Sequence, residues 1–259
     1  DANAVEVTKL SLLLKCMEGE TEASIKQQLG MFHDRVLPTL DENIKCGNSL
    51  IDQDYYDGKL DLGEDKNIRP FTWKASFPEV FKKHGGFHAV IGNPPYIRVQ
   101  LLQGGAGVVE YLSGHYRSAS KGNYDIYVVF IEKALQIAND AGKVGYILPH
   151  KFFNADYGAG VRAVLKESTS VESIVHFGHQ QVFDGATTYT CLLMLGKGSK
   201  RRDLTYARIE DLEAWRVERK EPDKRINYSS LGKDNWIFLS GPERTLFDRL
   251  KKSKLRLDT

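Results

Sequence analysis

The chain has 259 residues, of which 41% are hydrophobic and 27% charged, with a mean hydropathy of −0.39 and a formal net charge of +2. This composition is typical of a globular chain with a sizeable core, and it excludes intrinsic disorder. Nothing in the sequence predicts a membrane span, which needs about 18 apolar residues in a row, or a secretory signal. The three cysteines Cys16, Cys46 and Cys191 lie far apart, which excludes a zinc ribbon or disulfide scaffold and is typical of a reducing cytoplasm.

Charge is distributed unevenly along the chain. From residue 197 onward there are 17 Lys and Arg against 11 Asp and Glu, whereas the first 196 residues carry 19 against 23. A basic final third suits a polyanionic partner, although runs such as Lys251-Lys252-Ser253-Lys254 also occur as solvated helix ends. The charge pattern therefore permits a nucleic-acid partner without requiring one.

Hydrophobic periodicity predicts helices that alternate with short apolar strands. The predicted helices are residues 4–17, 77–83, 124–139 and 161–166. The predicted strands are residues 44–46, 87–91, 144–148, 171–177 and 189–195, and the strand at 87–91 is expected to be buried. Residues 52–75 are polar and turn-rich, and residues 104–107 form a predicted Gly-rich loop. This alternation predicts an α/β fold with a mostly parallel sheet.

The character of the sequence changes after Gly198, where dense charge replaces the apolar strands and isolated aromatic residues such as Trp215 and Trp236 remain. We therefore expect a domain boundary between residues 198 and 240. Residues 1–198 are predicted to form one α/β domain. Residues 199–259 are predicted to form a linker and the start of a second domain.

The tetrapeptide Asn93-Pro94-Pro95-Tyr96 is the most informative feature of the sequence. It follows the predicted strand at 87–91, so it should lie at the carboxyl end of the sheet, where α/β enzymes bind ligands. The two prolines fix φ and lack N–H groups, which leaves backbone carbonyls to face a ligand. The Asn93 side-chain oxygen and the Pro94 carbonyl then form a rigid pair of acceptors beside the ring of Tyr96. Such a site would hold a planar group that carries an NH2, and the alternative is a rigid loop with a buried Asn.

The segment VIGNPPY resembles motif IV of the S-adenosylmethionine-dependent N6-adenine DNA methyltransferases. Upstream, DANAVEVTKLSLLL resembles the end of motif II and the following helix, and IKCGNSLI resembles motif III. Downstream, KGNYDIYVVFIEKAL, GKVGYILPHKFF and HFGHQQVFDGATTYTCLLML resemble motifs V, VI and VIII in the same order. Together these segments cover roughly residues 1–196, and their sequence character is similar to that of type IIG restriction-modification enzymes.

The resemblance implies a Rossmann-like class I S-adenosylmethionine-dependent methyltransferase fold, of which this chain would lack the first strands. It also implies transfer of a methyl group from S-adenosylmethionine to N6 of adenine in DNA, with no metal required. The two N6 hydrogens would be accepted by Asn93 and Pro94, and this would aim the nitrogen lone pair at the methyl group. Pro95 and Tyr96 complete the motif. This contact strengthens as positive charge develops on nitrogen, so it acts mainly on the transition state.

A base inside a duplex must be flipped out to reach such a pocket. Stacking on an aromatic side chain returns about 1–3 kcal/mol per base. Tyr96 is the expected stacking face, and Phe183 matches the second aromatic residue of the family. The alternative for Phe183 is a core aromatic.

The resemblance also suggests cofactor contacts. Asn48 matches the motif III acid that accepts from the adenine amine of S-adenosylmethionine, although Asn replaces the usual Asp and could simply be a turn residue after Gly47. Asp1 matches the Asp two residues after the ribose-binding acid. The Gly-rich loop that wraps the methionine part in this family would precede Asp1, so we expect the chain to be N-terminally incomplete and inactive by itself. The Gly-x-Gly pairs at 105–107 and 158–160 are interpreted as a loop and a helix start instead.

The implied partners are double-stranded DNA and the other parts of a larger bacterial polypeptide. These parts would be an upstream cofactor-binding segment, a downstream target-recognition domain beginning within residues 199–259, and in some members a nuclease. A cytoplasmic, nucleoid-associated location is expected. The sequence shows no Pro-Asp…Glu-x-Lys nuclease signature and does not identify the DNA target.

Two other functions remain open. Protein-glutamine N5-methyltransferases also use NPPY, because a side-chain amide presents a planar NH2, but they are smaller and lack the long helix at 124–139 and the basic extension. A truncated methylase could instead persist as a non-catalytic DNA-binding module. Binding of S-adenosylmethionine would separate this last hypothesis from the enzyme.

Overall fold

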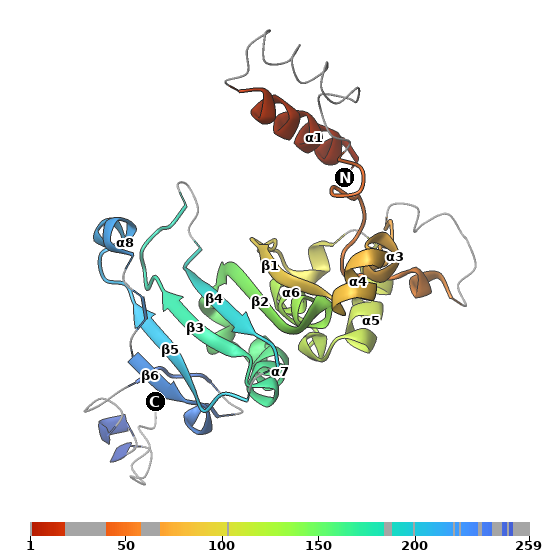
Figure 1. Ribbon diagram of the computed structural model, residues 1–259. Helices are drawn as coiled ribbons and strands as arrows, with labels where there is room; N and C mark the ends of the chain where they lie inside the picture. The colour runs from red at the N-terminus through yellow and green to blue at the C-terminus, as the bar shows by residue number, and fades with distance from the viewer. Residues whose placement is uncertain are drawn as a thin grey trace. The chain divides into compact units, whose positions relative to one another are not determined.

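A computed structural model of the chain describes two compact units, Asp1–Pro78 and Glu79–Thr259 (Figure 1). The described residues are 2–18, 40–57, 68–102, 104–183, 188–198, 200–219, 221–222, 224–232, 235–239, 245–247 and 249–250. Among the described helices, none combines the length and apolar character needed to cross a lipid bilayer.

The described residues of the first unit form one longer helix and two short ones. They are the helix α1 (Ala2–Met17), the 3-10 helix η1 (Gln53–Tyr56) and the helix α3 (Trp73–Ser76). The helix predicted at 4–17 is confirmed, but none of its residues is buried, and Leu10 and Leu14 are each 58% exposed.

The strand predicted at 44–46 is wrong. The backbone turns at this point, because the N–H of Ile44 donates to the carbonyl of Leu40 at 2.8 Å. Among residues 40–57 and 68–78, extended pairing is limited to a single bridge between Asn48 and Pro70. A run of three residues with Lys45 in its middle offers too little apolar surface to hold a strand in place.

The second unit is built on one sheet. Its helices are α4 (Pro78–His84), α5 (Gly105–His115), α6 (Tyr127–Ile137), α7 (Ala159–Ser168) and α8 (Leu212–Glu218). Its strands are β1 (Phe87–Gly92), β2 (Ala138–Pro149), β3 (Val171–His176), β4 (Thr190–Gly196), β5 (Asp203–Arg208) and β6 (Lys224–Asn227). Short 3-10 helices connect them: η2 (Val99–Leu101), η3 (Arg117–Ala119), η4 (His150–Phe153), η5 (Asp156–Gly158) and η6 (Tyr228–Ser230).

The sheet is mixed, with the strand order β1-β2-β4-β3-β5-β6. The pairs β1/β2 and β3/β5 are parallel, whereas β2/β4, β3/β4 and β5/β6 are antiparallel. The α/β class is therefore confirmed, but the expectation of a mostly parallel sheet is corrected. The described parts of the β3–β4 connection, 177–183 and 188–189, contain no crossover helix, so the chain reverses and β4 runs antiparallel to both neighbours.

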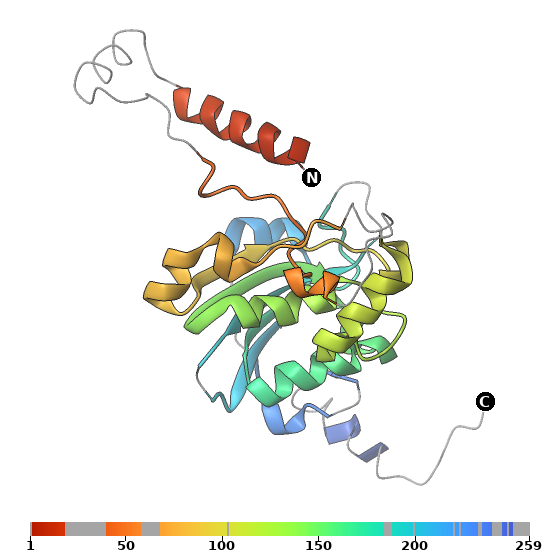
Figure 2. The same ribbon diagram turned by 90° about the vertical axis from the view of Figure 1, so that its right-hand side faces the viewer.

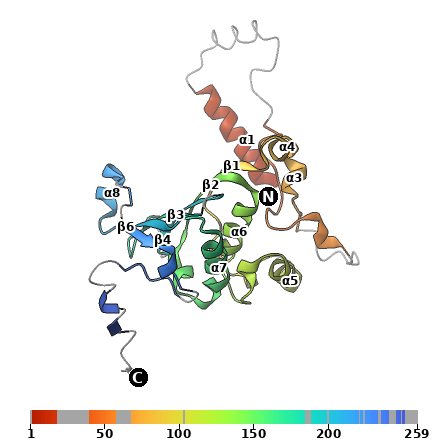
Figure 3. The same cartoon turned by 60° about the horizontal axis from the view of Figure 1, so that its bottom comes forward.

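Helices cover both faces of this sheet. Figures 2 and 3 show α6 and α7 on one face and α8 on the other. Side chains alternate along each strand, so Val175 and Leu192 pack with Trp215 of α8, while the neighbouring Ile174 and Leu193 are fully buried in the main core.

The strand predicted at 87–91 is present as β1, but it is not buried. It lies at the end of the strand order and pairs only with β2 among the described strands, and Ile91 is 91% exposed. An apolar strand sequence predicts burial on both faces, yet an edge position leaves part of that surface open.

Two further boundaries differ from the prediction. The helix predicted at 124–139 is α6, which ends at Ile137 because Ala138 already pairs with Phe87 as the first residue of β2. The Gly-rich segment at 104–107 is not a loop but the start of α5, with Gly104 as its N-cap at a φ of 91°.

The sheet continues across residue 198, where a domain boundary was predicted. The strand β5 pairs with β3, and the Tyr228 hydroxyl donates to the Val171 carbonyl at 2.7 Å. Trp236 is buried, and its backbone N–H donates to the Phe153 carbonyl at 2.8 Å. The strand β5, Tyr228 and Trp236 thus complete the same core. The assignment of residues 199–259 to target recognition stays a prediction.

Candidate active site

The tetrapeptide 93–96 directly follows β1, at the edge of the sheet where both β1 and its parallel neighbour β2 end. Within it, Pro94 is buried, Tyr96 is half-buried, and Asn93 and Pro95 are exposed. The preceding Gly92 lies against Tyr146 of β2, where a Cβ would approach the tyrosine ring to 3.1 Å. The motif therefore starts from a closely packed point and presents the Asn93 side chain outward.

The segment after the motif is fastened to the chain just before α6. The N–H of Ile126 donates to the Ile97 carbonyl at 2.9 Å, and the N–H of Val99 donates to the Tyr124 carbonyl at 3.0 Å. Between these bonds, Nε of Arg98 lies 3.2 Å from Oδ1 of Asp125. Two backbone bonds and an ion pair thus fix the end of the motif to a second segment.

Both the hydroxyl and the ring of Tyr96 contact neighbouring groups. Its hydroxyl donates to the Ile147 carbonyl of β2 at 3.1 Å, and its ring meets Tyr127 edge-to-face at a centroid distance of 6.5 Å. Burial, with a smaller contribution from Cys191, raises the pKa of Tyr96 to about 12. The phenol therefore stays neutral, and the ring is fixed in orientation.

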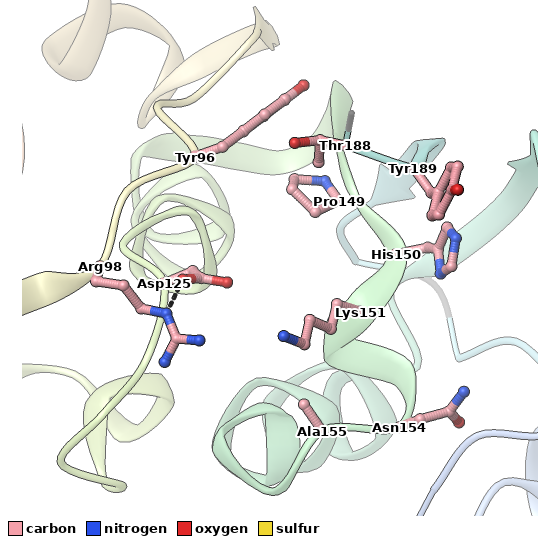
Figure 4. Close-up of a pocket in the computed structure, with 10 residues that line it drawn as sticks. All are labelled: Tyr96, Arg98, Asp125, Pro149, His150, Lys151, Asn154, Ala155, Thr188 and Tyr189. Atoms are coloured by element: carbon pink, nitrogen blue, oxygen red, sulfur yellow. Dashed lines mark ion pairs between the residues drawn. The ribbon is translucent and has the colours of Figure 1, made fainter. Parts of the chain in front are cut away.

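Tyr96 forms one wall of a cavity of about 640 Å³. The lining residues come from the motif segment, from the chain before α6, from the end of β2 and from the start of β4 (Figure 4). They are Tyr96, Arg98, Asp125, Pro149, His150, Lys151, Asn154, Ala155, Thr188 and Tyr189. This volume lies within the range of roughly 300–1,000 Å³ that is usual for small-molecule sites.

Neither Asn93 nor Phe183 is among the residues that line this cavity. Phe183 is half-buried, and the aromatic residue that lines the cavity near it in sequence is Tyr189. Both Tyr96 and Tyr189 line the cavity, and in the view of Figure 4 Thr188 and Pro149 lie between them. Tyr96 thus lines the cavity and Phe183 does not, while the stacking roles predicted for both residues stay predictions.

Sequence reasoning missed His150, Lys151 and Tyr189. The available signal was their position, because His150 and Lys151 directly follow β2 at the same edge of the sheet as the tetrapeptide. Tyr189 precedes β4, and Thr190 is paired with Pro149. The carboxyl ends of neighbouring strands are the usual place for ligand-binding residues.

His150, which lines the cavity, lies next to a second histidine, His176. The rings of His150 and His176 are 4.1 Å apart, and Nδ1 of His176 accepts the N–H of Gly178 at 2.9 Å. Burial, followed by the charges of His150 and Arg208, lowers the pKa of His176 to about 4. Burial also lowers the pKa of His150. Both imidazoles are therefore neutral near pH 7.

The two residues expected to contact the cofactor have different outcomes. Asp1 lies outside the described residues. Oδ1 of Asn48 accepts the N–H of Leu50 at 3.2 Å, and its backbone N–H donates to the Arg69 carbonyl at 2.7 Å. Asn48 thus holds a turn, and its predicted contact with the cofactor stays a prediction. An amide oxygen has two lone pairs, so this side chain can still accept from one more donor.

The two Gly-x-Gly pairs serve the fold. A Cβ on Gly158 or Gly160 would collide with the backbone oxygens of Phe152 and Arg117, so these glycines permit close packing at the start of α7. Gly105 and Gly107 lie in the first turn of α5. Within the described parts of the chain, no group of three or more His, Cys, Asp or Glu side chains could hold a metal ion.

Comparison with known proteins gives a family match. The model of the Eco57I restriction-modification methylase family matches residues 1–183. The chain is 33% identical over 254 residues to the type II restriction enzyme and methyltransferase RM.Eco57I of Escherichia coli, covering 97% of this chain and 23% of that protein. It is 25% identical over 168 residues to the type II methyltransferase M.HincII of Haemophilus influenzae, covering 65% of this chain and 32% of that protein. The chain thus covers less than a third of the length of each of these two relatives.

The solved structures to which this chain is similar include the type IIG restriction endonuclease BpuSI. Its TM-score is 0.42 at 14% identity, over 56% of this chain and 19% of that one. A class I S-adenosylmethionine-dependent methyltransferase of Listeria monocytogenes, described as putative, has a TM-score of 0.42 at 16% identity, over 52% of this chain and 40% of that one.

Proposed function

The chain belongs to the Eco57I restriction-modification methylase family, and on this premise we propose that it carries the base pocket and catalytic motif of a DNA methyltransferase. The proposed reaction transfers a methyl group from S-adenosylmethionine to N6 of an adenine flipped out of double-stranded DNA. The enzyme would act within a bacterial restriction-modification system, together with other parts of a larger polypeptide.

One observation carries this proposal. Tyr96, three residues after Asn93 in the tetrapeptide, forms a wall of a cavity large enough for a nucleotide, and Tyr189 also lines this cavity. Aromatic rings in a cavity lining suit a planar base, because every base has a π-face that can stack. Tyr189 is therefore our candidate for the second stacking residue, beside the predicted Phe183.

The tetrapeptide would act on the amine of the base. The exposed Asn93 amide oxygen and the carbonyl of the buried Pro94 would accept the two N6 hydrogens. The Pro94 carbonyl is pre-positioned, because Pro94 and Pro95 fix the backbone and Gly92 is packed against Tyr146. The backbone that carries Asn93 is held between the same residues. Their hydrogen bonds strengthen as positive charge develops on N6, which lowers the barrier more than it stabilises the bound base.

The methyl donor would be S-adenosylmethionine, which supplies a methyl group already activated by a sulfonium. Asn48 fits the adenine end of such a ligand in its chemistry, since its amide oxygen can accept from an amino group while it also holds the turn. No described residue is assigned to the methionine end. We therefore expect the 259-residue chain alone to transfer few methyl groups, because orientation of the donor accounts for much of the rate. Transfer of a tritiated methyl group to unmethylated DNA would measure this.

The proposed reaction is tested by producing the full-length protein in a host whose DNA lacks adenine methylation. Single-molecule sequencing should then find N6-methyladenine at one recurring short sequence. Methylation of cytosine N4 instead would overturn adenine as the target. Unmethylated DNA together with a methylated protein glutamine, found by mass spectrometry, would favour the protein-glutamine alternative.

A further inference from the structure

Lys151 lies at the carboxyl end of β2, two residues after Pro149, and lines the cavity. The parallel register of Gly92 with Tyr146 brings this end of β2 beside the end of β1, where the tetrapeptide begins. Figure 4 shows the Lys151 side chain extending into the cavity toward the facing pair of Arg98 and Asp125. Its ammonium group therefore faces whatever occupies the cavity.

The charges on the cavity wall do not cancel. Arg98 is paired with Asp125 at 3.2 Å and also donates to Oδ1 of Asn123 at 2.9 Å. The same Asp125 carboxylate accepts the Tyr157 hydroxyl at 2.8 Å, so it is held toward Arg98 and Tyr157. No carboxylate among the described residues forms an ion pair with Lys151. The cavity thus carries one uncompensated positive charge.

We propose that the Lys151 ammonium binds a phosphate attached to the flipped nucleotide, while the base stacks on Tyr96. The inference rests on the proposed function, because it takes the occupant of the cavity to be a nucleotide. A cavity with aromatic rings and a single free cation matches a ligand that has a planar part and an anionic part. An ammonium on a flexible stem can follow a phosphate without the fixed geometry that a guanidinium requires. Lys151 would then be a positioning residue that holds the sugar-phosphate so that N6 faces Asn93.

The test uses the full-length protein and three fluorescent probes. They are 2-aminopurine 2′-deoxyriboside and its 5′- and 3′-monophosphates, whose fluorescence is quenched by stacking. We expect the wild-type protein to bind one of the monophosphates about tenfold more tightly than the nucleoside, as a charge-assisted contact would give. In Lys151→Ala this advantage should disappear, while the affinity for the nucleoside is unchanged.

Two control variants sharpen the result. Lys151→Arg should keep most of the phosphate advantage, because the charge is retained. Lys82→Ala, which removes an exposed lysine of α4, should behave as the wild type. A phosphate advantage that persists in Lys151→Ala would overturn the inference. Loss of S-adenosylmethionine binding in Lys151→Ala would also overturn it, by placing the ammonium on the donor's carboxylate.

These outcomes are distinct from failure of the proposed function. The probe experiment needs no methyl transfer, so it can support the phosphate contact whatever base the enzyme modifies. If the wild-type protein quenches none of the three probes, the cavity is not a base pocket, and this outcome overturns both the inference and the base pocket of the proposed function.

Discussion

At the scale of single residues, Tyr96 has two separable parts. The ring faces the cavity, whereas the hydroxyl is bonded to the Ile147 carbonyl of β2. The motif requires an aromatic face for stacking, and the hydroxyl bond fixes the direction of that face. The hydroxyl bond therefore positions the ring, and the proposed contact with the base falls to the ring.

Substitutions at Tyr96 should separate these parts. Tyr96→Phe should bind the 2-aminopurine nucleoside nearly as well as the wild type but lose about 1 kcal/mol of unfolding free energy, because one hydrogen bond is removed. Tyr96→Ala should lose about tenfold or more in probe affinity, because the stacking face is gone. Equal losses of affinity in the two variants would refute the stacking role.

Asn93 allows a sharper prediction for catalysis. In the full-length enzyme, Asn93→Ala should reduce methyl transfer at least about a hundredfold, since a lost hydrogen-bond acceptor to developing charge typically costs that much. The affinity for S-adenosylmethionine, measured by calorimetry, should change little, because the side chain is expected to contact the target amine. A variant that keeps a tenth of the wild-type turnover would contradict this role.

His176 makes stability depend on pH. Its pKa is about 4 in the folded chain, against an ordinary value of 6.5, so the unfolded chain binds the proton more readily. The unfolding free energy should therefore fall as the pH drops from 6.5 to 4, by up to about 3 kcal/mol, with no further loss from this group below pH 4. Protonation would also break the bond from the Gly178 N–H to Nδ1.

The check is a comparison of melting temperatures between pH 7 and pH 4.5 for the wild type and His176→Asn. The asparagine oxygen can still accept from Gly178 but does not titrate in this range. The variant should show a flatter pH profile, although His150 continues to contribute. The same profile in both proteins would mean that His176 is not the titrating group.

At the scale of elements, α6 is joined to η3 by a buried carboxylate. Glu132 is 8% exposed and accepts the backbone N–H of Ser118 at 2.7 Å and that of Arg117 at 3.3 Å. Glu132→Ala should cost about 2–3 kcal/mol of unfolding free energy, because two backbone donors lose their acceptor in a buried place. Glu132→Gln keeps one oxygen and should cost less. Urea denaturation would measure both, with the exposed Glu110→Ala of α5 as a control that stays near the wild type.

Elements with strong periodicity could be read from the sequence. The helix α7 and the strands β3 and β4 lie close to their predicted positions, because their apolar pattern directly reflects the face that is buried. The order of the strands could not be read, since placing β4 between β2 and β3 depends on pairing between residues distant in sequence. The edge position of β1 depends on the same long-range pairing.

In the candidate site, too, contacts between residues distant in sequence could not be predicted. Tyr96 could be predicted because the tetrapeptide is contiguous and its chemistry is local. Lys151 meets it because β1 pairs with β2, and Tyr189 meets it because Pro149 of β2 pairs with Thr190 of β4. A single sequence shows that Lys151 follows a strand and that Tyr189 precedes one, but it does not report the pairings that bring them to Tyr96.

At the scale of the whole molecule, the surplus of basic residues after Lys197 should act in DNA binding. Three basic residues of this region are exposed: Lys200, Arg202 and Arg225. The first two precede β5, and Arg225 lies in β6, which pairs with β5. None of the three forms an ion pair with any residue that the structure describes. Exposed cations without carboxylate partners are available to phosphates. Each phosphate contact contributes about 0.9 to the slope of log affinity against log salt concentration.

Replacing these three residues together with glutamine in the full-length protein should therefore lower the salt slope of DNA binding by up to about three. The matched control replaces Lys74, Lys82 and Lys121, which are also exposed but lie in the part of the chain with an acidic surplus. Both triple variants lose the same net charge, so a general electrostatic effect would reduce both slopes equally. A reduced slope in the first variant alone would place the DNA backbone against the β5/β6 pair, and equal slopes in the two variants would refute this.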